Sequence, residues 1–324
     1  MTARAEDSRS TARLRRPVVV GVDDPTTSRF ALDWAIDEAS RHRLPLHIVR
    51  ACPVPPGSRI DPDEDAADRG TSAVLAEAAS RAQALSPDLE VVTETPVAEP
   101  SAALVEASKK AACLVVGARG RGALVGAVLG TTSLDVAAHG ECPVVVVREL
   151  PRPTATPPRV VVGADGSEWS AGAIGYAFAQ ASERLVPLTV VHVSPPSDID
   201  GTRLALRRAG SDLLALSQRE QALAAEEIAG WSEKYPDVTV YRHVLSGHPV
   251  KALVDHSEGA ELLVVGSRGR SRLAGMLLGS VSQGVLQHAH CPVAVVRAGA
   301  ASERLTTCPF WVFAMRPSVY RAWE

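Results

Sequence analysis

The sequence has few cysteines, no long apolar run and almost no net charge. Its five cysteines are an odd number without the spacing of a secreted disulfide scaffold, which favours a reducing compartment. No stretch approaches the ~18 consecutive apolar residues of a membrane span, and the N-terminal residues lack the apolar core of a secretion signal. The net charge of −3 gives no bulk attraction to nucleic acid or to an anionic membrane. The sequence therefore predicts a cytoplasmic protein that binds neither membrane nor nucleic acid.

Motifs for several common chemistries are also missing. No Gly-Lys-Ser/Thr follows a glycine loop, so there is no P-loop. The run Gly120-Arg121-Gly122 imitates a dinucleotide fingerprint, but it follows the fourth apolar run of its half and not the first. The run His288-Ala289-His290-Cys291 has metal-ligand residue types, yet Glu141 stands in place of His290 in the other half, and zinc needs further ligands. No nucleophile, base and acid recur as a set, so we expect no catalytic residues and no resident metal.

The sequence does contain one domain-sized pattern written twice. Gly117 and Gly266 are related by the same offset as Cys142 and Cys291, and the pattern extends across most of both halves. A repeat of this period indicates tandem duplication, and 324 residues with 46% hydrophobic content suit two globular domains. We expect a flexible arm at 1–16, domains at 17–149 and 159–298, a proline-rich linker at 150–158 and a C-terminal extension at 299–324.

Within each half, apolar runs alternate with amphipathic stretches. Continuous valine runs such as Val18–Val20 and Val160–Val162 suit strands that are buried on both faces. Helical spacing of apolar residues follows, as at Ala31, Trp34 and Ala35. Five strands alternating with helices predict an α/β domain with a parallel sheet and right-handed crossovers. Ligands of such sheets bind beyond the carboxyl ends of the strands.

Each half carries the same glycine motif after its fourth apolar run. Both copies read G-x-x-G, nine residues, then G-(Ser or Thr), and they begin at Gly117 and Gly266. Glycines let backbone N–H groups approach a ligand closely, and the start of the next helix attracts anions. Asp23 and Asp165, which follow the first apolar run of each half, should lie at the same sheet edge. Turn-forming glycine is the alternative, but two copies with identical spacing favour a phosphate site in each half.

With these motifs the chain resembles the universal stress protein family in its tandem-domain, ATP-binding form. The resemblance implies two Rossmann-like domains, each with a five-stranded parallel sheet flanked by helices and each binding one ATP, with or without Mg²⁺. By the resemblance, Asp23 and Asp165 contact the adenosine end of the nucleotide, and Ala51 and Val193 lie against adenine. The full set of expected cofactor-binding residues is Gly21, Asp23, Ala51, Gly117, Ala118, Arg119, Gly120, Arg121, Gly122, Ala123, Gly130, Thr131 and Thr132 in the first half, and Gly163, Asp165, Val193, Gly266, Ser267, Arg268, Gly269, Arg270, Ser271, Arg272, Gly279, Ser280, Val281 and Ser282 in the second.

The resemblance also implies a regulatory role in stress, with a homodimer and an unknown regulatory protein as partners. ATP would be held more than hydrolysed; a weak ATPase and a nucleotide-independent interaction module are the alternatives. In this family the last strand commonly pairs domains, so we expect Pro143–Val147 and Pro292–Val296 to pair within the chain. One departure stands out: Asp24-Pro25 replaces the Gly-Ser that follows Asp165. We therefore expect the first half to have a different turn beside its site.

Overall fold

The computed structural model describes residues 16–53, 65–118, 129–148, 156–194, 228–269 and 277–297. The arm before residue 16, most of the predicted linker and the extension after residue 297 lie outside these ranges. The elements of the first half are β1 (Val18–Gly21), α2 (Arg29–His42), β2 (Leu46–Val49), α3 (Asp65–Leu85), β3 (Val91–Glu94), α4 (Pro100–Ser108), β4 (Cys113–Gly117), α5 (Thr131–His139) and β5 (Val144–Val147). Those of the second are β6 (Val160–Ala164), α6 (Glu168–Arg184), β7 (Leu188–Ser194), β8 (Val240–Ser246), α9 (Pro249–Ser257), β9 (Leu262–Gly266), α10 (Ser280–His288) and β10 (Val293–Val296).

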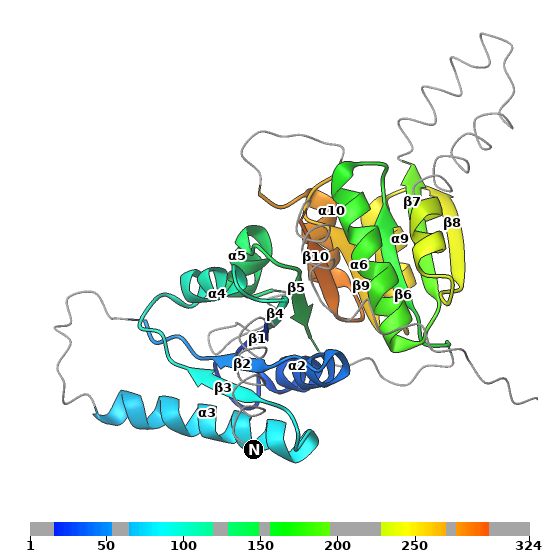
Figure 1. Ribbon diagram of the computed structural model, residues 1–324. Coiled ribbons are helices and arrows are strands. Elements are labelled where there is room, and N and C mark those ends of the chain that lie inside the picture. The colour runs from blue at the N-terminus through cyan, green and yellow to red at the C-terminus, as the bar shows by residue number, and fades with distance from the viewer. Residues whose placement is uncertain are drawn as a thin grey trace, which may run out of the picture.

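The strands form one continuous sheet with the order β3-β2-β1-β4-β5-β10-β9-β6-β7-β8. Within each half all neighbouring strands are parallel, as the alternation of strands and helices predicts. The halves meet where β5 and β10 pair antiparallel, with Val144 opposite Val295 and Val146 opposite Val293. Figure 1 shows β5 and β10 side by side at the centre of the molecule. The expected pairing of the last strands is confirmed, and it joins two five-stranded sheets into ten strands.

Helices cover both faces of this sheet, and each face has one core that runs through both halves. One core gathers buried residues of α2, α3 and α6 against alternate strand positions such as Val18 and Val20. The other gathers residues of α4, α5, α9 and α10 against the positions between them, such as Val19. Successive residues of a strand point to opposite faces, so every central strand must be apolar throughout. This explains the unbroken valine runs of the sequence.

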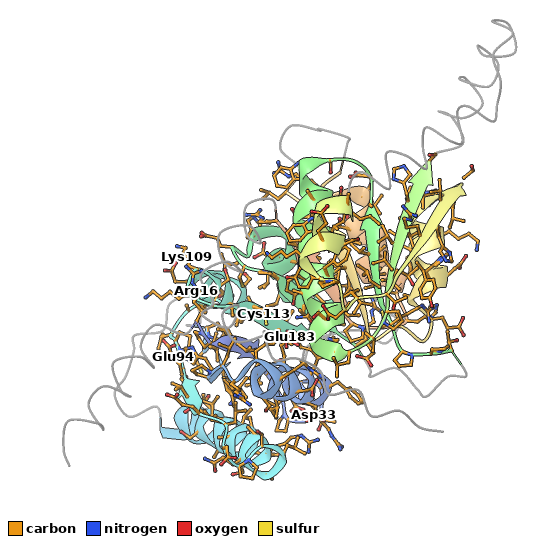
Figure 2. All side chains as sticks on the ribbon, turned by 45° about the vertical axis from the view of Figure 1, so that its right-hand side comes forward. Arg16, Asp33, Glu94, Lys109, Cys113 and Glu183 are labelled. Carbon is orange, nitrogen blue, oxygen red and sulfur yellow. The ribbon has the colours of Figure 1, made fainter. Side chains whose placement is uncertain are left out.

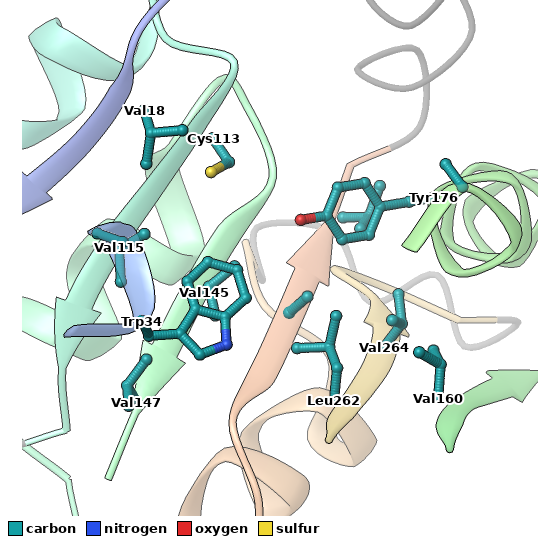
Figure 3. Close-up of a cluster of buried hydrophobic side chains, with 14 of the residues drawn as sticks. Val18, Trp34, Cys113, Val115, Val145, Val147, Val160, Tyr176, Leu262 and Val264 are labelled. Carbon is teal, nitrogen blue, oxygen red and sulfur yellow. The ribbon is translucent and has the colours of Figure 1, made fainter. Parts of the chain in front are cut away.

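Helices α2 and α6 extend the contact between the halves on one face. Trp34 of α2 and Tyr176 of α6 occupy equivalent positions and are only 5% and 4% exposed. Figure 3 shows the Trp34 ring on the side of Val145 and Val147 and the Tyr176 ring on the side of Leu262 and Val264, all within one core. At the end of α6, the carbonyl of Glu183 accepts a hydrogen bond from Arg41 of α2, and Figure 2 shows Glu183 beside that helix.

Charged side chains also form hydrogen bonds between the two halves. The carboxylate of Glu38 in α2 accepts hydrogen bonds from Gln180 at 2.6 Å and from Arg184 at 2.8 Å, both in α6. Arg297 donates to the carbonyl of Ala138 in the other half at 2.6 Å, and Arg148 of the first half donates to that of Leu286. The two halves are therefore joined by backbone pairing, apolar packing and hydrogen bonds together.

Two strands of the second half are longer than the apolar runs that mark them in the sequence. β7 and β8 are each seven residues long and pair along their whole length, from Leu188 opposite Val240 to Ser194 opposite Ser246. The apolar run that marks β7 in the sequence ends earlier, because its last residues alternate in polarity near the edge of the sheet. Among the described residues, no helix is long and apolar enough to cross a membrane.

Candidate functional site

The sheet topology brings the two predicted motifs of each half together. β1 pairs with both β2 and β4, and β6 pairs with both β7 and β9. The strand order therefore reverses beside β1 and β6, and open α/β sheets bind ligands at the carboxyl ends of the strands at such a point. Asp23 and Asp165 follow the first strands of this pattern, and the glycine motifs follow β4 and β9. Because β5 and β10 are antiparallel, the two sites lie at opposite edges of the joined sheet.

In the second half, Asp165 is fixed by a tight turn before α6. Its Oδ1 accepts a hydrogen bond from the backbone N–H of Ser167 at 3.1 Å and from the Ser167 hydroxyl at 2.6 Å. Ser167 caps α6 in turn, because its Oγ accepts from the N–H of Ser170. Between them Gly166 has a φ of 79°, a left-handed conformation that glycine adopts without steric cost. The Asp-Gly-Ser sequence thus holds the carboxylate in one place.

The glycine motif of the second half approaches this carboxylate directly. A Cβ atom added to Gly269 would lie 2.6 Å from Oδ2 of Asp165, so a side chain at this position requires Asp165 to move. A Cβ added to Gly266 would lie 3.0 Å from the carbonyl oxygen of Trp169, in the first turn of α6. The loop backbone therefore packs closely on the turn that carries Asp165, as the glycine pattern predicts.

The ends of each glycine motif are pinned in the same way in both halves. The N–H of Gly130 donates to the carbonyl of Ala118, and the N–H of Gly279 donates to that of Ser267, both at 2.8 Å. A serine in the following helix then binds the last residue of the strand. Ser133 donates to the carbonyl of Gly117 and Ser282 donates to that of Gly266, both at 2.6 Å. Sequence reasoning missed Ser133, although its equivalence to Ser282 in the repeat would have found it.

These contacts use up several groups that were expected to bind the ligand. The N–H of Ala118 donates to Val147 and that of Ser267 to Val296, so neither amide is available to a nucleotide. Ser267 is only 1% exposed, and its hydroxyl has no hydrogen-bond partner among the described residues. The hydroxyl of Ser282 is already donated inside the fold. The structure gives all three residues a part in bracing the loop.

The starts of α5 and α10 remain suited to an anion. Thr131 and Ser280 are the first residues of these helices, after Gly130 and Gly279 in extended conformation. The first N–H groups of a helix have no partner within it, and they lie at the positive end of its dipole. Neither helix has a side-chain hydrogen bond at its N-cap. Each helix therefore presents the backbone N–H groups of its first turn beside its glycine motif.

The first half departs from this arrangement at the turn after β1. Here α2 begins at Arg29, whereas α6 begins at Glu168, which is equivalent to Thr26 of the first half. The carboxylate of Asp24 accepts from the N–H of Thr26 at 2.9 Å, and the hydroxyl of Ser28 accepts from the N–H of Asp23 at 3.0 Å. Asp24 stands where Gly166 has its left-handed conformation, but Asp24 has no positive φ. The turn therefore follows another path, and the predicted difference is confirmed.

Of two further predicted pairs, one has a packing role and the other lies near the site edge. A Cβ added to Gly21 would lie 2.8 Å from Leu104 of α4, and one added to Gly163 would lie 3.1 Å from Leu253 of α9. These glycines let a helix approach the sheet beside the site. Ala51 and Val193 follow or lie within the second strand of each half and are partly exposed, so both remain near the site edge.

Several predicted ligand residues fall outside the described part of the chain. These are Arg119, Gly120, Arg121, Gly122, Ala123, Arg270, Ser271 and Arg272. In the described ranges, no group of three or more His, Cys, Asp or Glu side chains could hold a metal ion.

Comparison with known proteins fits this architecture. The universal stress protein family matches residues 15–148 and again residues 157–297. A universal stress protein of Mycobacterium tuberculosis is 38% identical over 304 residues, which cover 89% of this chain and 99% of that protein. The crystal structure of a universal stress protein from Archaeoglobus fulgidus has a TM-score of 0.61 at 22% identity and covers 88% of this chain and 97% of its own.

One similar structure spans a single half of the chain. It is a universal stress protein in complex with cAMP, 30% identical, which covers 41% of this chain and 97% of its own, with a TM-score of 0.35. The family match covers both halves, and the Mycobacterium relative extends through both as well. The chain therefore belongs to the universal stress protein family and carries two domains of this family in tandem.

Proposed function

We propose that this chain is an ATP-binding regulator of the stress response, located in the cytoplasm, whose nucleotide occupancy signals to a protein partner. The observation that carries the proposal is the contact between Asp165 and the backbone of Gly269. It places a fixed carboxylate beside the bare backbone of a glycine, near the N–H groups at the start of α10. A carboxylate suits the hydroxyls of a ribose, and the helix start suits phosphate.

ATP is the expected ligand of both halves, and the second half should bind it more tightly. Its Asp-Gly-Ser turn fixes Asp165 through two hydrogen bonds before any ligand arrives. The first half has the same loop-end contacts but a different turn. A group that is already held in its binding conformation loses less entropy on binding. The cytoplasmic location agrees with the free cysteines of the described residues, Cys52, Cys113, Cys142 and Cys291.

The experiment is to identify and titrate the nucleotide on the full chain. Mass spectrometry of the supernatant from denatured protein should find ATP among adenine nucleotides that include cAMP. Calorimetry of emptied protein should find two ATP sites; Asp165→Ala should abolish the tighter one and Asp23→Ala the weaker one. Asp88→Ala is the control, because Asp88 is exposed in the turn before β3, at the other end of the strands. If the chain binds no adenine nucleotide, the proposal is wrong, and a nucleotide-independent interaction module becomes the favoured function.

We expect ATP to be held and not turned over. Phosphoryl transfer needs a positioned nucleophile as well as charge stabilisation, and the residues near the site suggest only the second. Steady-state turnover should stay far below the ~1–10³ s⁻¹ of typical enzymes. A rate inside that range that Asp165→Ala abolishes would make the protein an ATPase.

Signalling requires that ATP bind one state of the protein better than another. A partner that reads this state should be captured from lysate by the ATP-loaded chain and not by Asp23→Ala/Asp165→Ala. The homodimer and the identity of the partner stay predictions.

A further inference from the structure

The second half has an aromatic–cation stack beside its glycine motif. The guanidinium carbon of Arg268 lies 5.3 Å from the centre of the Trp169 ring. Arg268 is the second residue after β9, and Trp169 is the second residue of α6. Both side chains are partly exposed. An arginine over a tryptophan face is attracted by the ring, and its planar group is thereby held in one orientation.

The stack is fixed to the site by the backbone on both sides. Gly266 lies so close to the carbonyl of Trp169 that an added Cβ would approach it to 3.0 Å, and Gly279 lies against the Cα of Arg268. The next residue, Gly269, meets Asp165. Arg268 therefore stands between the Asp165 turn and the start of α10, where the phosphates of a nucleotide are expected.

A second cation lies near Arg268. Burial and the charge of Arg268 both lower the pKa of Arg297, which Glu141 raises. Arg297 is held in place by its hydrogen bond to the carbonyl of Ala138. The positive charges of Arg268 and Arg297 oppose each other, and an anion placed beside Arg268 would offset that repulsion. The region around Arg268 is therefore one that favours an anionic ligand.

The first half cannot make this stack. The residue equivalent to Trp169 is Thr27, which has no aromatic ring. Thr27 precedes α2, and its N–H lies 3.4 Å from the carboxylate of Asp24, in the turn that replaces the first turn of α6. Both loops have an arginine at this position, Arg119 and Arg268. The two halves therefore differ in the residue that could hold the arginine, which is Trp169 in the second half and Thr27 in the first.

We propose that Trp169 is a positioning residue that holds Arg268 toward the phosphate groups of the nucleotide in the second half. The second site then distinguishes ATP from adenosine more strongly than the first does. This inference rests on the proposed function, because it assigns a specificity to the same site. It goes beyond it in giving the two halves different selectivity.

The test compares ATP with adenosine in calorimetric titrations of the full chain carrying Asp23→Ala, so that the second site alone is measured. Trp169→Leu should weaken ATP binding about fivefold, the scale of one lost cation–π contact, and leave adenosine within about twofold. Trp169→Phe, which keeps a ring, should recover part of the loss. Arg268→Gln should weaken ATP at least as much as Trp169→Leu. Lys234→Gln removes the cation from another tryptophan, Trp231, at 5.2 Å, and should change neither affinity.

The outcomes separate this inference from the proposed function. If the parent binds ATP and Trp169→Leu leaves its affinity unchanged, the positioning role is wrong and the nucleotide site stands. Equal weakening of ATP and adenosine, with a lowered melting temperature, assigns Trp169 to folding and also overturns the inference. A second site that binds no ATP in the parent refutes both.

Discussion

Glu38 is the buried carboxylate at the contact between the two halves, and its replacement should weaken the whole fold. Its side chain is 3% exposed and lies 3.1 Å from His42, with Gln180 and Arg184 of the other half as further partners. Burial by itself raises the pKa of Glu38, but the hydrogen bond with His42, the charge of Arg184 and the Gln180 amide lower it from 4.5 to about 2. A lowering of this size corresponds to roughly 3 kcal/mol of stabilisation at neutral pH.

The variant Glu38→Gln keeps the size of the side chain and removes its charge. Arg184 would then remain 5% exposed without its best partner, although Asp37 at 3.9 Å and Glu261 at 3.5 Å still face it. Breaking a buried pair by removing one partner costs about 3–5 kcal/mol. Because Asp37 and Glu261 still offset the charge of Arg184, we expect the loss of unfolding free energy to lie at the lower end of this range, about 3 kcal/mol. Replacing both partners, as in Glu38→Leu/Arg184→Met, should recover at least about 2 kcal/mol of that loss.

Urea unfolding followed by circular dichroism and by tryptophan fluorescence measures both effects. The tryptophan signal is informative because Arg184 also lies over the ring of Trp34, 5.3 Å from its centre. Glu106→Gln is the matched control, since Glu106 is exposed and its carboxylate forms an ion pair with Lys109, three residues later in the chain. If Glu38→Gln lowers the unfolding midpoint no more than Glu106→Gln does, or if the double variant is additive, the buried charge does not hold the halves together.

Two further predictions follow from the same contacts and from helix packing. Burial lowers the pKa of His42, but the hydrogen bond with Glu38 and the charge of that carboxylate raise it overall. The stabilisation that His42 gives to the fold is therefore complete below about pH 6.5, and it is lost as pH rises through the higher pKa of the folded state. The melting temperatures of wild type and His42→Gln should therefore differ most near pH 6 and converge in alkaline buffer; a constant difference would contradict this. Gly175→Ala should destabilise by about 1–3 kcal/mol, because its Cβ would lie 2.5 Å from the ring of Trp231. Gly70→Ala, whose Cβ meets no described atom within 4 Å, should instead stabilise α3 by up to about 1 kcal/mol, and equal effects in urea unfolding would refute the packing argument.

The sequence alone determined the repeat, the class of fold and the edge where the site lies. Valine runs with helical stretches between them permit little besides buried parallel strands, because a strand that is apolar on both faces needs helices on both faces. The carboxyl edge then follows from topology, and it brings Asp165 and the glycine motif into one place before any contact is known. The unusual turn at Asp24-Pro25 was also visible, since Asp24 stands where Gly166 is left-handed and the proline after it restricts its backbone further.

The tertiary structure decided how equivalent positions are used differently. The repeat makes Trp34 equivalent to Tyr176 and Glu38 equivalent to Gln180. Only packing shows that the two rings belong to one core and that Gln180 donates to Glu38 across the joined halves. The resemblance to the family indicated that the last strands pair, whereas the register of Val144 opposite Val295 required the structure.

The same limit applies within the site. Glycine spacing predicted a phosphate loop, but nothing in that spacing reveals that the amides of Ala118 and Ser267 are used inside the fold, or that Arg268 lies on Trp169. Local pattern determines which face of an element is apolar and where backbone can bend, because those properties belong to neighbouring residues. Contacts between residues nearly a hundred positions apart depend on how whole elements pack, and only the folded chain determines them.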